Sequence, residues 1–269
     1  MPLKADALPS AAPGGPPGIA GDEGFFLAAA AIMVAVVIGG FLNLWLQGVT
    51  SFAAPWPVHV HAVVFMGWVG LFALQVWLAT RGPLALHRRL GWIAVAWIPL
   101  LLVVGTATIV RVMRLGTTPP MWTPAYFLVM NMMALVAFAI LTAAAIRLRR
   151  ETAWHRRLIF CGMAALAITP VNRLMPVAVL FAVMSLASAV AILLFPLAGM
   201  LSDWRRTGRV HPAWAWGLGA LVLSGLATEL IGRSAFAGAA VTSLAAGTPG
   251  ADRPPLAWPG LGPPPIAKA

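Results

Sequence analysis

The feature that most constrains this chain is a series of apolar runs, each long enough to cross a bilayer. A hydrocarbon core about 30 Å thick needs roughly 20 apolar residues in an α-helix. Seven such runs occur, at about residues 25–47, 58–80, 90–112, 124–146, 157–173, 176–201 and 213–231. The sequence therefore predicts an all-α, polytopic membrane protein with about seven transmembrane helices, in which runs two to five build a four-helix core.

The composition agrees with this fold class. Hydrophobic residues make up 61% of the 269 residues and charged residues only 9%, a balance that a water-soluble domain of this size does not have. The fifth and sixth runs are the least regular, because Pro170, Asn172, Arg173 and Pro176 interrupt them. We expect a tight turn at the membrane surface there; the alternative is a kinked fifth helix, which would change the number of spans.

The loops predict the orientation of the chain. Eleven arginines follow the even-numbered runs (Arg81, Arg88, Arg89, Arg147, Arg149, Arg150, Arg156, Arg157, Arg205, Arg206 and Arg209), and three follow the first three odd-numbered runs (Arg111, Arg114 and Arg173). The positive-inside rule then predicts a cytoplasmic N-terminus and an external C-terminus in a bacterial cytoplasmic (inner) membrane. The net charge of +11 is accounted for by topology, so we expect no nucleic-acid partner.

Both termini are rich in proline and glycine. Residues 1–24 are predicted to be a disordered leader rather than a cleaved signal peptide, because a positive first segment is missing. Residues 25–232 form the predicted transmembrane domain, and residues 233–269 an external tail that we expect to be disordered from about Gly247. The single cysteine, Cys161, excludes a disulfide within the chain.

A short basic motif occurs twice, as His87-Arg88-Arg89-Leu90 and His155-Arg156-Arg157-Leu158. The 68-residue shift suggests that runs two–three and four–five are duplicated hairpins running in the same direction. Two interpretations remain open for the two histidines. Either the motifs anchor helix ends among lipid phosphates, or the imidazoles ligate the iron of one haem b, with Arg88 and Arg156 on its propionates and Gln75 nearby. Against the haem interpretation, both histidines precede their apolar runs.

Helical spacing places a second group of polar residues near the outer end. His61, Phe65, Trp68, Phe72 and Gln75 follow one face of the second run, whereas His59 lies about 200° from His61. A similar stripe in the fifth run ends at Thr169 and Arg173, and Asn131 lies in the outer half of the fourth. His61, Asn131 and Arg173 therefore form either a buried network that fixes helix packing, or a pocket for a lipid, a quinone or a small anionic ligand.

Other chemistry is weakly supported. The outer half holds eight methionines, which with His61 offer soft ligands for Cu(I) as a further alternative. Glu229 and Arg233 have the spacing of a helical ion pair. Carboxylates are otherwise nearly missing from the spans, and the hydrolase, zinc-protease and nucleotide-binding motifs are absent. The sequence names no catalytic residue and leaves open whether the protein is an enzyme.

These elements resemble a family of uncharacterised bacterial membrane proteins, catalogued as domain of unknown function 2306, over roughly residues 58–201. The family pattern matches at His61 with Gln75, at 87–91, at His155-Arg156 and at 173–176. It departs at Cys161-Gly162, where the family usually has an Arg-Ser pair. The resemblance implies a bundle similar in layout to b-type membrane cytochromes and no assigned activity.

The leading hypothesis is therefore a redox-linked membrane protein that binds one haem b between His87 and His155. The competing hypothesis is a non-enzymatic membrane factor that binds its ligand at the outer pocket or assists the assembly of another membrane complex. The expected partners are the lipid bilayer and, for either hypothesis, a quinone or another membrane redox complex.

Overall fold

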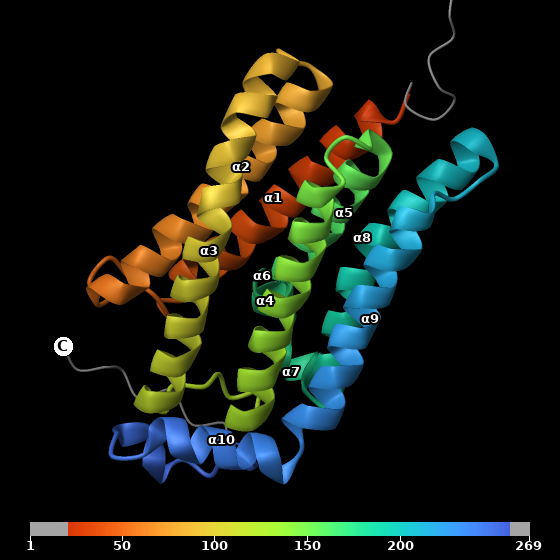
Figure 1. The fold of residues 1–269 in the computed structure, drawn as a ribbon. Coiled ribbons are helices and arrows are strands. Elements are labelled where there is room, and N and C mark those ends of the chain that lie inside the picture. Colours follow the sequence, from red (N-terminus) through yellow and green to blue (C-terminus); the bar gives the residue numbers. More distant parts are fainter. Residues whose placement is uncertain (1–20, 259–269) are drawn as a thin grey trace, which may run out of the picture.

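The computed structural model describes residues 21–258, and all regular elements within that range are helices (Figure 1). The elements are α1 (Glu23–Leu46), α2 (Trp56–Thr80), α3 (Leu84–Leu115), α4 (Pro124–Arg147), α5 (Thr152–Leu166), α6 (Ile168–Leu174), α7 (Val177–Leu180), η1 (Phe181–Val183), α8 (Met184–Thr207), α9 (Pro212–Gly232), α10 (Ala235–Ala245) and η2 (Pro249–Asp252).

The predicted fold class is confirmed. Six helical segments of the described chain are long and apolar enough to cross a membrane, and α5 with α6 makes a seventh if the bent pair is one span. Each predicted run has its helical segment, although α3 begins six residues and α5 five residues before the runs at 90–112 and 157–173. The protein is thus an integral, multi-pass membrane protein whose helices contact the lipid bilayer.

The fifth span contains both a kink and a turn. Its axis bends by 49° between α5 and α6, one turn before the Pro170 position. Proline has no N–H to donate to the Leu166 carbonyl, and its ring crowds that oxygen, so the helix cannot continue straight. The chain then turns at Met175, whose extended backbone (ψ 139°) is the conformation favoured before Pro176.

The helices α1 to α6 pack in a ring. α3 lies between α2 and α4, α5 packs on α4, and α1 closes the ring by packing against both α2 and α6. The expected four-helix core therefore has α1 as an additional wall. Outside the ring, α9 packs on α4 and α5, and α8 packs on α9, α5 and α6.

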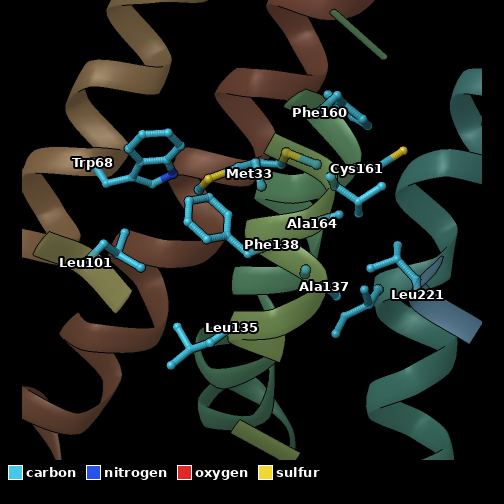
Figure 2. Packing of buried hydrophobic residues seen from close by; sticks show 14 of the residues in the cluster. Met33, Trp68, Leu101, Leu135, Ala137, Phe138, Phe160, Cys161, Ala164 and Leu221 are labelled. Carbon is cyan, nitrogen blue, oxygen red and sulfur yellow. The ribbon is translucent and has the colours of Figure 1, made fainter. Parts of the chain in front are cut away.

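Close packing holds the ring together. Met33 from α1, Trp68 from α2 and Phe138 from α4 meet in the middle of the bundle (Figure 2). The Trp68 and Phe138 rings have their centroids 5.1 Å apart, edge to face. Outside the ring of helices, Gly217 of α9 lies against the Cys161 side chain of α5, where a larger residue would clash. Small residues let helices approach closely where the hydrophobic effect gives no drive to associate.

The C-terminal segment is more ordered than the sequence suggested. α10 lies across the ends of α3 and α4 (Figure 1). The disorder predicted from Gly247 is wrong for residues 247–258, because η2 packs on α3 and the Pro255 carbonyl accepts from Ala125 N–H at 3.0 Å. Gly250 makes this possible, since a Cβ there would overlap the Met113 carbonyl. Residues 1–20 and 259–269, the rest of the predicted leader and tail, lie outside the described residues.

The two ends of the bundle differ in charge. We call the end with the connections at 81–83, 148–151 and 208–211 the arginine-rich end, and the opposite one the α10 end. At the arginine-rich end Asp203 of α8, only 4% exposed, accepts from Arg157 Nη2 at 2.7 Å and from Trp214 Nε1 at 2.9 Å. Asp22, fully buried, pairs with Arg156. Glu229 is thus not the only carboxylate near the spans, and Asp22 belongs to the packed bundle rather than to a leader.

We predict that Asp203→Asn destabilises the protein by about 3 kcal/mol, because it removes the nearer of the two carboxylates that pair with the buried Arg157 guanidinium and leaves only Asp22, at 3.5 Å. Thermal unfolding in detergent measures this as a lower midpoint. The matched control is Glu151→Gln, since Glu151 is an exposed carboxylate at the same end. Equal midpoints for the two variants would contradict a structural role for the Asp203–Arg157 pair.

Candidate ligand sites

The two histidines of the repeated motif lie face to edge at the arginine-rich end. Each is the fourth residue of its helix, His87 in α3 and His155 in α5. Their ring centroids are 6.3 Å apart and the ring planes meet at 79°. Because both helices begin earlier than expected, both histidines lie in the first helical turn, although they still precede the apolar parts of α3 and α5.

Each imidazole is held by a backbone carbonyl of the preceding helix. His155 Nδ1 lies 2.9 Å from the Ala145 carbonyl oxygen, and His87 Nδ1 lies 3.2 Å from that of Gln75. A carbonyl oxygen only accepts hydrogen bonds, so these contacts require the proton on Nδ1. The Nε2 atom then carries the free lone pair, which is the form of histidine that ligates a metal.

The side chain of Gln75 adds a second contact to His87. With its amide nitrogen toward α3, it donates to the His87 carbonyl at 3.1 Å and accepts from Gly91 N–H at 3.0 Å. That orientation also brings the amide nitrogen to Nδ1, where it competes with the Nδ1–H form. The opposite orientation places the amide oxygen there as an acceptor. The orientation of this amide therefore sets which nitrogen of His87 carries the proton.

The arginines of the motif have different surroundings. Arg88 is exposed. Arg156 pairs with Asp22, and its guanidinium lies 5.1 Å from the centre of the Phe26 ring. The role of Arg88 toward a propionate stays a prediction, whereas Arg156 contributes to the ion cluster that joins the start of α1 to α5.

A cavity of about 160 Å³ lies inside the ring of helices, and all of α1 to α6 contribute to its lining. The three residues predicted for an outer pocket, His61, Asn131 and Arg173, all line it. The stripe of the second run supplies Phe65 and Trp68 as well. The structure thus brings together the polar residues that helical spacing had placed at one end. Their role in binding stays a prediction.

Hydrogen bonds define the state of His61. Thr108 Oγ1 donates to the Val104 carbonyl at 2.8 Å and lies 3.2 Å from His61 Nδ1. The hydroxyl has one proton, which it donates in the hydrogen bond to the Val104 carbonyl. His61 Nδ1 must therefore be the donor to Thr108 Oγ1. The Nε2 atom of neutral His61 is then an acceptor.

Asn131 and Arg173 differ in how well they are paired. Asn131 donates to the Phe127 carbonyl at 2.8 Å and accepts from Thr169 at 3.2 Å, as the packing interpretation requires. The Arg173 guanidinium stacks 4.4 Å from the Phe41 ring centre, but its buried Nη1 has no hydrogen-bond partner. No carboxylate of residues 21–258 forms a salt bridge with it.

A second cavity, of about 410 Å³, opens at the α10 end and was not foreseen from the sequence. Trp122, Tyr126, Phe181 and Trp258 line it together with Arg233. The predicted pair of Glu229 and Arg233 is confirmed at 2.9 Å. Its aromatic residues come from three distant segments, so no local pattern marks this cavity.

The chain was also compared with known proteins. No family model, curated protein or solved structure matches it.

We predict that His61 and His155 are Nδ1–H tautomers when neutral, because their Nδ1 atoms donate to Thr108 and to the Ala145 carbonyl. Nitrogen-15 spectra of the histidine-labelled protein distinguish the two tautomers. His61→Gln and His155→Gln assign the signals by their loss. An Nε2–H pattern for either residue would contradict the hydrogen-bond geometry.

Proposed function

We propose that this integral membrane protein is redox-linked and binds one haem b between His87 and His155. The observation that carries the proposal is the 6.3 Å between the ring centroids. A metal–imidazole bond is about 2.0 Å long and a ring nitrogen lies about 1.2 Å from the ring centre, so two imidazoles on opposite sides of one iron have centres roughly 6.4 Å apart. The observed separation agrees with this value, and binding would further require that Nε2 of both rings turn toward the iron, since the rings stand edge to face.

The number of ligands favours a porphyrin over a bare metal ion. Within residues 21–258 no group of three or more His, Cys, Asp or Glu side chains gathers around a common point. Two imidazoles alone leave most of the coordination positions of an iron ion open. A porphyrin supplies four nitrogens of its own and needs only two axial ligands from the protein, and bound haem iron supplies one-electron transfer.

The residues of the chain would hold and tune such a group. The Ala145 carbonyl would keep the His155 imidazole in the Nδ1–H form, with Nε2 available. The Gln75 carbonyl would do the same for His87 when the Gln75 amide turns its oxygen toward Nδ1. Exposed Arg88, one residue beyond His87, offers a positive charge for a propionate. The arginine bias of the loops supports placing this end at the cytoplasmic face of a bacterial inner membrane.

The first test is the visible spectrum of the full chain purified from haem-supplied cells. We expect a reduced-minus-oxidised α band of a bis-histidine haem b, lost in His87→Ala and in His155→Ala. His59→Ala is the matched control, because His59 lies at the α10 end of α2, away from the pair. A colourless wild-type protein, or a band that survives both pair variants, would refute haem binding between them.

A second measurement uses the angle between the ring planes. Axial imidazoles near perpendicular, as at 79°, give a strongly anisotropic low-spin ferric signal in electron paramagnetic resonance, whereas parallel rings give a rhombic one. We expect the anisotropic signal, and its loss with the α band in the two pair variants. A rhombic signal would show that the rings rotate on loading and would contradict their preorganisation.

Gln75 gives a prediction about the reduction potential. Gln75→Glu places a carboxylate beside the His87 Nδ1–H and increases the electron donation of the ring, so the midpoint potential should fall. Gln75→Leu removes the side-chain contact but keeps the backbone carbonyl, so the haem should be retained with a smaller change. Redox titration of the α band checks both. A potential unchanged in Gln75→Glu would exclude Gln75 as a positioning residue for His87.

A further inference from the structure

We infer that the cavity enclosed by α1 to α6 binds the head group of a quinone. This cavity is separate from the histidine pair, and the inference does not rest on haem binding. The inference rests on three features of the cavity: its lining residues carry unpaired hydrogen-bond donors, one of them has a positive charge without a counter-charge, and the volume fits one ring.

Two buried donors of the lining have no partner. One is Arg173 Nη1 and the other is Trp68 Nε1, which belongs to a side chain only 4% exposed. Buried donors normally have partners, because leaving one unpaired costs about 1–3 kcal/mol. Both donors belong to residues that line one cavity, which points to a ligand that offers acceptor oxygens after a small rotation of these side chains.

The two donors lie at different depths. Trp68 lies seven residues from His61 on α2, which is about 10 Å along the helix axis at 1.5 Å per residue. His61 and Arg173 lie at the same end of the cavity. A ligand with one acceptor oxygen satisfies one donor. A quinone carries two carbonyl oxygens at opposite ends of its ring and can reach toward both.

Size and lining match a single substituted ring. The volume of about 160 Å³ is close to the roughly 150 Å³ of an engineered apolar cavity that holds benzene. Apolar side chains such as Phe65, Val112 and Leu135 make up most of the walls. A space of this size excludes a whole phospholipid, and its apolar walls suit a ring that partitions into the bilayer.

The charge of Arg173 favours the same ligand. An unpaired guanidinium inside a membrane bundle is costly and normally marks a functional position. A carbonyl oxygen near Nη1 would accept a hydrogen bond from it, and the guanidinium charge would attract the partial negative charge of that oxygen. His61 Nε2, an acceptor in neutral His61, can accept a hydrogen bond from the hydroxyl of a quinol.

The test is calorimetric titration of the full-length protein in detergent with duroquinone, a neutral ring with two carbonyls, and with benzoate, an anionic ring. We expect duroquinone to bind, and its affinity to fall at least tenfold in Arg173→Gln. Trp68→Phe, which keeps the ring and removes the donor, should weaken it as well. Arg114→Gln is the control, since Arg114 is an exposed arginine at the same end.

Two further variants keep the result interpretable. Ala134→Leu fills the cavity without changing its charge and should abolish binding. Arg173→Gln removes an unpaired buried charge, so the ligand-free variant should unfold at a temperature no lower than wild type, which separates lost binding from lost folding. His87→Ala should bind duroquinone as wild type does, so that a failure of haem binding and a failure of this inference are distinguishable.

Three outcomes would overturn the inference. No binding of duroquinone to the wild type removes it directly. Equal binding to wild type and Ala134→Leu places the quinone elsewhere on the protein. Binding of benzoate without duroquinone assigns the cavity to small carboxylates instead.

Discussion

A bilayer core offers no water to polar groups, so each buried polar group of this bundle must find its partner within the protein or in a ligand. The ion cluster at the arginine-rich end meets this demand with Asp22 and Asp203 against Arg156, Arg157 and Arg206. It joins α1, α5 and α8, which are far apart in the sequence. The ion cluster therefore fixes how the N-terminal helix and α8 are placed against α5.

The histidine pair and the cavity lined by α1 to α6 contain polar atoms without hydrogen-bond partners. These unpaired atoms make both of them candidate sites. At the histidine pair, the Ala145 carbonyl accepts a hydrogen bond from His155 Nδ1 and leaves Nε2 of that ring available, whereas Gln75 contacts His87 through both its carbonyl and its amide. In the cavity lined by α1 to α6, Thr108 accepts a hydrogen bond from His61 Nδ1, whereas Arg173 Nη1 and Trp68 Nε1 have no partners.

Helical periodicity predicted much of both candidate sites. The i, i+4 and i, i+3 spacing selected His61 over His59 and placed Arg173 on the face that lines the cavity, because side chains one turn apart share a helix face. The same logic did not reveal Trp68 as an unpaired donor or Phe41 as the ring under Arg173. Phe41 belongs to α1, and nothing local in its sequence shows that α1 closes the ring.

The sequence by itself determined that the chain spans a membrane as a helical bundle, where its arginine-rich loops lie, and that two histidines begin neighbouring helices. Apolar length and charge distribution decide these properties, and both are local. Only the tertiary structure decided that the centroids of the two histidine rings stand 6.3 Å apart, that Asp203 pairs with Arg157, and that residues 247–258 pack on α3 and α4. These properties depend on the angles at which distant helices cross, which no local pattern specifies.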